Sequence, residues 1–347
     1  MAIAGVASLW RRHWAWFIPF SAVFLLLFVP AAIRYGIGTD YFYTYVPGLD
    51  IVASTGENAQ WEIGFLAICK AVLYLDLPDQ WMFGIASFLT CALALAAFPR
   101  RGFAWCILGF VVAMYLPSYN VVRQELAVAV CLFAFSLHLR RKEALAIVVF
   151  VSAMLFHTSV IILFPLVVIA ECALRFQAKV IIGMGAVFAI VILVCHPLDV
   201  FMRVISFVPV AESYLSYENS DGYMGSGVAN SGLGFLSWYV VWLVQGFFLL
   251  LKSKSRQGRE IGVWCLMALL VKIVGSQVNI FARVSLATDA VLPFSLSLMP
   301  RRVRTLTEKL AFAGVVLLLL ILFFHDYGFN SNVHGSGEVL PYRTIFD

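Results

Sequence analysis

The sequence predicts an all-α polytopic membrane protein with about eleven transmembrane helices. Of its 347 residues, 62% are hydrophobic and only 12% are charged. The mean hydropathy is +0.93, a value that excludes a soluble globular domain of this length. Long apolar runs alternate with short basic clusters, as in chains that cross a bilayer repeatedly. Because no long polar block interrupts this pattern, one membrane domain over residues 1–347 is expected, without an appended catalytic domain.

The apolar runs define the predicted spans, since a helix needs about 20 apolar residues to cross a bilayer. The boundaries are soft, so roughly 10 to 12 spans are compatible with the pattern. The fifth and sixth spans are short enough to form one bent element. Arg11 and Arg12 before the first span imitate a signal peptide, but the many later spans favour an uncleaved helix. The spans lie near residues 14–33, 79–98, 103–118, 119–138, 144–156, 158–173, 180–196, 233–251, 261–277, 281–299 and 309–325.

Six basic clusters orient these spans. With eleven spans, all six fall on the same side, which the positive-inside rule makes cytoplasmic. The N-terminus is then cytoplasmic and the C-terminus outside, with outer regions near 34–80, 196–232 and 326–347. Within the first of these, "WEIGFLAICKAVLYL" is too short to cross comfortably and suits an interfacial helix. The clusters are Arg11/Arg12, Arg100/Arg101, Arg140/Arg141/Lys142, Arg175/Lys179, Lys252/Lys254/Arg256/Arg259 and Arg301/Arg302/Arg304/Lys309.

Seven of the 24 Lys and Arg residues depart from this rule and fall in the outer half of the membrane or the outer loops. A cation held against the rule usually serves an anion or an ionic partner. Three of them, at the outer ends of different spans, are candidates to converge: Arg34, Arg123 and Arg283. The others are Lys70, Arg203, Lys272 and Arg343.

The stretch "SYNVVRQELAVAV" places a polar group at the head of an apolar helix. Asn120, Arg123 and Gln124 have spacings that put all three on one face of a continuous helix. A helix N-terminus together with a guanidinium suits phosphate oxygens. Two alternatives remain open: polar residues at the membrane surface, or a salt bridge from Arg123 to an outer carboxylate such as Asp40 or Glu62.

His157 begins "HTSVIILFPL" at the outer junction of the fifth and sixth spans. It either caps the next helix or orients a phosphate and accepts a proton from a sugar hydroxyl. Thr158 and Ser159 would cap that helix in the structural alternative. Asp40 and Glu62 are further candidate bases, or would hold Arg34 in place.

Metal ligands and cofactor motifs are not expected. "TDYFYTY" has one Asp and no Asp-x-Asp pair, so a metal–diphosphate clamp has little support. The cysteines form no C-x-x-C pair. Those within apolar runs are predicted to be small buried hydrophobic residues: Cys91, Cys106, Cys131, Cys172 and Cys265. A cationic site without metal fits this composition better.

Two further regions carry polar residues. Lys272, Ser276, Asn279 and Arg283 share a face if one helix continues through them, which conflicts with the predicted break near residue 278; Asp289 is a candidate to neutralise one of these cations. The run "AESYLSYENSDGYMGSGVANSGLG" is rich in hydroxyls and amides, suited to sugars and also typical of any mobile loop. Tyr217 within it is a candidate glycan contact.

Five motifs resemble, in order, the EpsG-like members of the Wzy-type polysaccharide polymerases: "RYGIGTDYFYTY", "WEIGF", "NVVRQELAVAV", "FHTSVIIL" and "LPYRTIF". The resemblance implies a GT-C-like architecture in the bacterial inner membrane, with the active site facing the periplasm. It implies transfer of a growing glycan from undecaprenyl diphosphate to the non-reducing end of a new undecaprenyl-diphosphate-linked repeat unit, without metal or other cofactor. Partners would be this donor and acceptor, membrane lipid and, as a further candidate, a chain-length regulator; nucleic acid is not expected.

The resemblance also implies roles for individual residues. Arg123 would clamp the diphosphate, helped by Arg34 or Arg283, although the tyrosine expected after Arg283 is absent. The base is left open among His157, Asp40 and Glu62. The family pattern falls on Arg34, Asp40, Glu62, Asn120, Arg123, Gln124, His157 and Ser159.

Three rival functions follow from the same residues. An O-antigen ligase or another GT-C enzyme using lipid-linked sugars would share the cationic outer site, although a ligase usually has a larger outer loop. A lipid-linked oligosaccharide flippase or transporter would place its polar residues near the midplane and show internal repeats. A membrane O-acyltransferase would share only the histidine.

Overall fold

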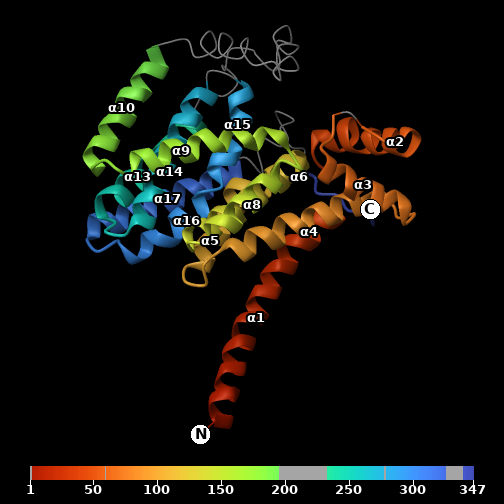
Figure 1. Ribbon diagram of the computed structural model, residues 1–347, viewed down its shortest axis with the longest axis horizontal. Coiled ribbons are helices and arrows are strands. Elements are labelled where there is room, and N and C mark those ends of the chain that lie inside the picture. The colour runs from red at the N-terminus through yellow and green to blue at the C-terminus, as the bar shows by residue number, and fades with distance from the viewer. Residues whose placement is uncertain (1, 59, 195–232, 277–278, 326–338) are drawn as a thin grey trace.

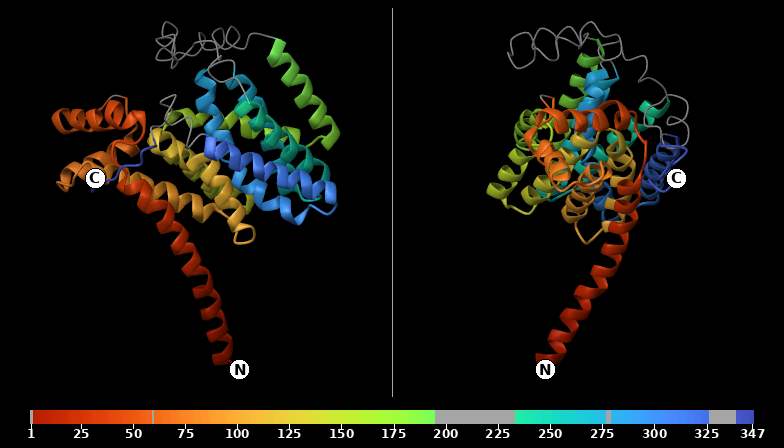
Figure 2. Two further views of the ribbon diagram at one scale, coloured as in Figure 1. Left: turned by 180° about the vertical axis from the view of Figure 1, so that it is seen from behind. Right: turned by 90° about the vertical axis from the view of Figure 1, so that its right-hand side faces the viewer.

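The computed structural model describes the whole chain except residues 1, 59, 195–232, 277–278 and 326–338. Within the described residues every regular element is a helix, and the single β-bridge there joins Arg34 to Thr344. Figures 1 and 2 show a helical bundle from which the long α1 projects, while α2 and α3 form a separate hairpin at one side. The outer region predicted at 196–232, with Tyr217, lies outside the described residues.

The helices follow the predicted spans closely, and the segment predicted to lie in the interface is the short helix α3. The α-helices are α1 (Ala2–Ile33), α2 (Val46–Thr55), α3 (Ile63–Tyr74), α4 (Gln80–Ala97), α5 (Phe103–Phe110), α6 (Pro117–Asn120), α7 (Val122–Leu139), α8 (Glu143–Ala153), α9 (Leu163–Ala173), α10 (Ala178–Val194), α13 (Leu233–Lys252), α14 (Arg256–Gly275), α15 (Asn279–Asp289), α16 (Leu292–Leu298) and α17 (Leu306–Phe324). Short π and 3-10 turns are η1 (Tyr41–Tyr45), η2 (Val111–Tyr115), η3 (Thr158–Ile162) and η6 (Met299–Arg301).

Helix length and composition agree with a membrane protein. Among the described residues, three helices are long and apolar enough to cross a membrane: α4, α7 and α17. Several others are apolar but shorter, including α8, α10 and the paired turn and helix Thr158–Ala173. The number of eleven crossings and the GT-C arrangement therefore stay predictions.

Burial agrees with the same class. Helix α7 is the centre of the bundle, packed between α4 and α8, and residues such as Ala127 and Val128 are fully buried. The outer helices instead expose large apolar side chains, for example Ile147 at 63% and Ile190 at 61%. Extended apolar surfaces of this kind require a lipid environment or a partner. Cys172 is also exposed, contrary to the prediction that it is buried.

Two predicted spans are broken by the backbone. Helix α6 begins at Pro117 and ends at Asn120, and Val121 leaves the helical conformation with φ −90° and ψ 58° before α7 begins. Asn120 therefore does not share a continuous helical face with Arg123 and Gln124, and that prediction is wrong. The span predicted at 281–299 is likewise divided between α15 and α16, where Pro293 occupies the first turn of α16.

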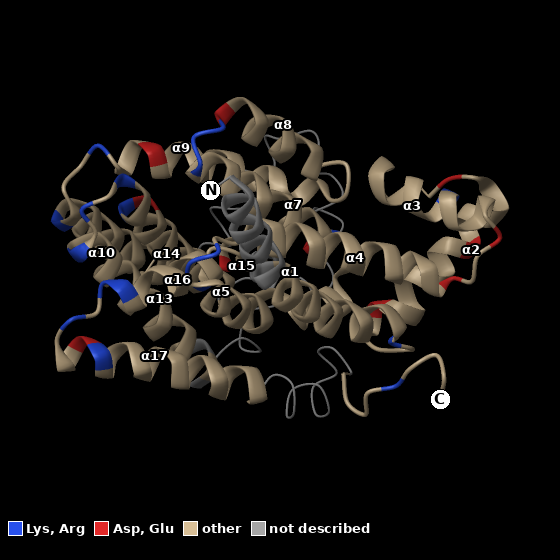
Figure 3. Cartoon of the chain, turned by 90° about the horizontal axis from the view of Figure 1, so that it is seen from below, with Lys and Arg blue, Asp and Glu red and all other residues tan. Residues whose placement is uncertain are grey.

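Apart from Arg11/Arg12 within the projecting α1, the helix ends that carry the basic clusters meet at one end of the bundle, and Figure 3 shows Lys and Arg on the loops between helices there. Arg140 at the end of α7 donates to the carbonyl of Ala97 at the end of α4. Further contacts join the other cluster-bearing ends: Arg256–Glu171, Lys252–Glu308 and Arg302–Ser255. This common end agrees with the predicted gathering of the clusters on one side of a membrane. We call it the basic end, and the opposite end the outer end.

The last residues of the chain pack onto the segment that follows α1. The amide of Tyr35 donates to the Arg343 carbonyl at 3.0 Å, and the amide of Ile345 donates to the Ile33 carbonyl at 3.0 Å. The Tyr342 hydroxyl donates to the Pro30 carbonyl at 2.5 Å. The "LPYRTIF" and "RYGIGTD" motifs, at opposite ends of the chain, therefore form one unit beside the outer end of the bundle.

Candidate active site

Three polar side chains from separate segments meet at the outer end. Arg123 lies in the first turn of α7, Glu62 directly precedes α3, and His157 directly precedes η3. The Arg123 Nη1 donates to Glu62 Oε2 at 2.8 Å, and His157 Nδ1 lies 3.1 Å from Glu62 Oε1. We call these three residues the outer triad. The sequence predicted each as a site residue, and the structure brings them together.

Glu62 is the centre of this triad. Besides His157, its Oε1 accepts the backbone N–H of Thr158 at 3.0 Å, so the carboxylate also holds the start of η3. Burial alone would raise the pKa of Glu62, but hydrogen bonds from His157 and Thr158, with the charge of Arg123, lower that pKa to about 2. Glu62 is therefore ionised near neutrality. A carboxylate with so low a pKa is a weak base, which favours an orienting role for Glu62.

Arg123 forms a salt bridge with Glu62, as one of the alternatives from the sequence predicted. Its Nη1 also donates to the Gln60 carbonyl at 2.8 Å, and its guanidinium lies 5.9 Å from the centre of the Trp61 ring. The backbone N–H of Arg123, one of the unpaired donors of a helix N-terminus, donates to the Tyr45 hydroxyl at 3.3 Å. The side chain remains 16% exposed, and its Nη2 donates to no described residue. Anion binding by this guanidinium stays a prediction.

Only one ring nitrogen of His157 has a hydrogen-bond partner among the described residues. Its Nδ1 faces Glu62, while its Nε2 has no hydrogen bond to a described residue. A carboxylate on Nδ1 fixes the tautomer with the proton on that nitrogen and leaves Nε2 as an acceptor. His157 makes no side-chain cap of η3, so the alternative of a simple helix cap is wrong.

Asn120 joins a second predicted motif to this region. Its Oδ1 accepts the Thr39 hydroxyl at 3.0 Å and the Asp40 backbone N–H at 2.9 Å. The approach depends on Gly38, whose φ is +93° and where a Cβ would lie 2.7 Å from the Tyr119 carbonyl oxygen. The "RYGIGTD" loop is thus held against the turn that precedes α7, and Asp40 is placed beside Asn120.

Arg34 is fully buried. Its guanidinium lies 5.1 Å from the centre of the Phe83 ring and 4.9 Å from that of Tyr119. It donates to the Ala31 carbonyl, to Ser87 Oγ at 3.2 Å and to the Tyr119 carbonyl at 3.5 Å. No carboxylate among the described residues pairs with it, so the prediction that Asp40 or Glu62 holds Arg34 is wrong. Arg34 instead supports the turn that carries Asn120.

The remaining predicted residues are not members of the triad, or lie outside the described residues. Gln124 is buried within α7, and Ser159 is half-buried in η3. Arg283 belongs to α15, but its side chain is not among those described. Its predicted convergence with Arg34 and Arg123 is therefore untested. Helix α14 ends at Gly275, and Asp289 pairs with Lys272 at 2.7 Å, as expected for a neutralising carboxylate.

Sequence reasoning missed the supporting residues of the triad. Tyr45 and Trp61 belong to an aromatic cluster with Phe65 beneath Arg123. Glu125, two residues after Arg123, is fully buried, and its carboxylate has no hydrogen-bond partner among the described residues. The aromatic content of "YFYTY" and "WEIGF" was the available signal, since rings next to a cation often contribute cation–π contacts.

The fold and these features define an all-helical membrane protein with a polar site at the outer end of its bundle. A family model described as the EpsG family matches residues 17–344, nearly the whole chain. The chain belongs to the EpsG family, a family of Wzy-like polymerases. Neither the comparison with curated proteins nor that with solved structures gave a match.

Proposed function

We propose that this protein is a polysaccharide polymerase that moves a growing glycan between undecaprenyl diphosphate carriers at the periplasmic face of a bacterial inner membrane. The donor is the glycan on its carrier, and the acceptor is the non-reducing end of a new lipid-linked repeat unit. The observation that carries the proposal is the outer triad, formed by motifs that this family model spans.

Arg123 acts on the leaving group. Breaking the bond between the anomeric carbon and the diphosphate oxygen leaves the electron pair on that oxygen, so negative charge builds there. A guanidinium in a site with little water stabilises that charge. Nη2 and the buried Nε of Arg123 have no hydrogen-bond partner among the described residues. Nη2 would donate to the incoming diphosphate, and Nη1 would be shared between the diphosphate and Glu62.

His157 acts on the acceptor. As the acceptor oxygen forms its bond to the anomeric carbon, its proton passes to Nε2 of His157. Glu62 holds the opposite ring nitrogen and stabilises the imidazolium that results, as carboxylates do for catalytic histidines. Undecaprenyl diphosphate leaves, and the chain is one repeat unit longer. This chemistry needs no metal, because both developing charges have a side chain to stabilise them.

The remaining motif residues fit substrate placement. Asp40 and Asn120 lie together on the loop and turn next to the triad, and a carboxylate and an amide are suitable partners for sugar hydroxyls. Arg34 is a positioning residue in this scheme, because it contacts the Tyr119 carbonyl from the interior.

The test is a gel of surface polysaccharide from the host bacterium with the gene deleted and then restored. We expect deletion to remove the long ladder while single repeat units remain attached to their lipid anchor. Restoration with the intact gene should return the ladder, and restoration with Arg123→Ala should not. Loss of every attached unit on deletion would instead indicate a ligase or an export step and would contradict the proposal.

A further inference from the structure

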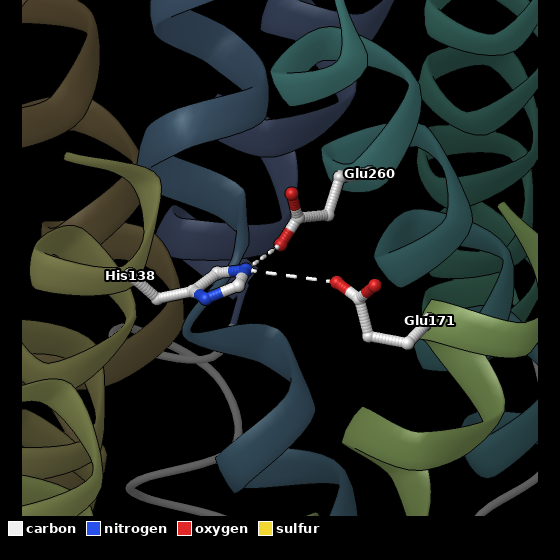
Figure 4. A group of neighbouring side chains, drawn as sticks. All are labelled: His138, Glu171 and Glu260. Atoms are coloured by element: carbon white, nitrogen blue, oxygen red, sulfur yellow. Dashed lines mark hydrogen bonds and ion pairs between the residues drawn. The ribbon is translucent and has the colours of Figure 1, made fainter. Parts of the chain in front are cut away.

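A second cluster of polar side chains lies at the basic end, far along the chain from the outer triad. His138 lies in the last turn of α7, Glu143 begins α8, Glu171 lies near the end of α9, and Glu260 lies in α14. The His138 Nε2 lies 2.6 Å from Glu260 Oε1 and 3.8 Å from Glu171 Oε1 (Figure 4). The ligand atoms of His138, Glu171 and Glu260 all lie within 4.8 Å of one another.

Two carboxylates of this cluster face one ring nitrogen. Glu171 Oε1 and Glu260 Oε1 both lie towards His138 Nε2, which can donate only one N–H. Glu260 is just 5% exposed, and two carboxylates that meet at one nitrogen repel each other unless further positive charge lies between them. This arrangement points to a positively charged ligand among these atoms.

The histidine is already oriented as a ligand. Its Nδ1 lies 2.6 Å from Glu143 Oε2, so a fourth residue outside the three-residue set directs Nε2 towards Glu171 and Glu260. Histidines that bind metal usually hold their other nitrogen by such a carboxylate. Arg256 fixes Glu171 in the same way, through a 2.5 Å contact with the oxygen that faces away from His138.

The charges favour a divalent cation. Three carboxylates carry three negative charges, and Arg256 supplies one positive charge. With a neutral histidine the cluster is short of two positive charges, which a divalent ion supplies. A nitrogen ligand disfavours Mg²⁺ and Ca²⁺, which prefer oxygen ligands, and suits Zn²⁺ and neighbouring transition metals.

The cluster borders a cavity. His138, Glu143, Glu171 and Glu260 line one wall of a cavity of about 690 Å³ between α7, α8, α9 and α14. The rest of the lining is mostly apolar, including Phe135. The cluster therefore borders an open volume.

We propose that His138, Glu171 and Glu260 bind a divalent transition metal, with Zn²⁺ as the preferred ion, and that Glu143 positions the histidine. The ion replaces the proton between His138 and Glu260 and leaves a coordination position towards the cavity. It links the ends of α7, α9 and α14, three helices otherwise joined there by ion pairs. The sequence predicts no metal site, so this site is additional to the proposed glycan transfer.

Purified protein in detergent, with its affinity tag removed and its metals stripped by chelation, tests this proposal. Titration with Zn²⁺, followed by calorimetry and elemental analysis, should give one bound ion and a rise in unfolding temperature. Glu260→Gln and His138→Gln should abolish this binding. Glu308→Gln is the matched control, because it removes another carboxylate of the basic end, paired with Lys252, and it should bind as the wild type does.

The conservative variant Glu143→Gln keeps the proposal testable if a ligand variant fails to fold. It should bind Zn²⁺ about 10- to 100-fold more weakly while eluting as a monodisperse species. Absence of Zn²⁺ binding to the intact protein, or equal binding by the wild type and the Glu143 and Glu260 variants, would overturn the proposal. The cluster would then be an ionic network around a protonated histidine. None of these readouts depends on polymerase activity.

Discussion

A histidine lies against glutamates near each end of α7, His157 from the segment before η3 and His138 from α7 itself, and the two are held differently. At the outer end, His157 meets Glu62 through Nδ1 only, and its Nε2 has no described partner. At the basic end, His138 is engaged through both ring nitrogens, with Glu143 and Glu260. A histidine held on one side can exchange a proton with a substrate, whereas one held on both sides suits a fixed link. The comparison separates a candidate catalytic centre from a candidate structural one.

Removing the imidazole of His157 should have the largest effect on activity. We expect His157→Ala to reduce glycan transfer by about 10²- to 10⁴-fold, the range for losing a general base. The polysaccharide ladder and the release of undecaprenyl diphosphate by purified protein both measure this. Near-normal transfer would show that Asp40 or another group is the base.

Removing the guanidinium of Arg123 should have the second-largest effect on transfer. Arg123→Ala should reduce transfer by about 10²- to 10³-fold, because a fixed charge at the developing diphosphate is lost. Arg123→Lys should recover only part of the activity, since an ammonium keeps the charge but lacks the forked donors. Full activity of the alanine variant would mean that the Arg123–Glu62 contact serves only stability.

Neutralising the orienting carboxylate should have a smaller effect. Glu62→Gln should reduce transfer by about 10- to 100-fold. His157 loses the carboxylate that orients it but is still present to act as the base. The variant should also shift the pH profile of transfer, which a merely structural residue would not do. A profile identical to that of the wild type would remove Glu62 from the mechanism.

The smallest effect concerns stability in acid. The pKa of Glu62 in the folded protein is about 2, below its usual 4.5. Its ionised contacts therefore stabilise the fold above pH 4.5, and this contribution is lost as the pH falls from 4.5 through about 2. The unfolding temperature of the wild type should fall more steeply over that window than that of Glu62→Gln. Parallel curves would contradict the strength of these contacts.

Much of the fold follows from the sequence because hydropathy reports lipid exposure directly. Most predicted spans are helices, and the Lys and Arg clusters other than Arg11/Arg12 gather at one end of the bundle, which agrees with the positive-inside rule. The breaks were harder to predict. Val121 is an ordinary residue in an apolar run, and only the neighbouring Pro117 and the tertiary contacts of Asn120 end that helix.

The candidate site was predictable in part. Arg123, Glu62 and His157 stand out because charged residues at membrane level need partners, and the partnership of Arg123 with Glu62 was one of two alternatives. The burial of Arg34 was not predictable, because it depends on Phe83 and Tyr119 closing over the guanidinium. The His138–Glu260 contact joins residues 122 positions apart, a distance that no local pattern reports.

The most direct test of the central claim is glycan transfer by purified protein in proteoliposomes supplied with a lipid-linked repeat unit. The wild type should extend the glycan and release one undecaprenyl diphosphate for each bond formed. His157→Ala should fail to do so, while His325→Gln, which changes an exposed histidine at the end of α17, should match the wild type. Equal extension by both variants, or extension that requires a histidine other than His157, would contradict the account of the outer triad.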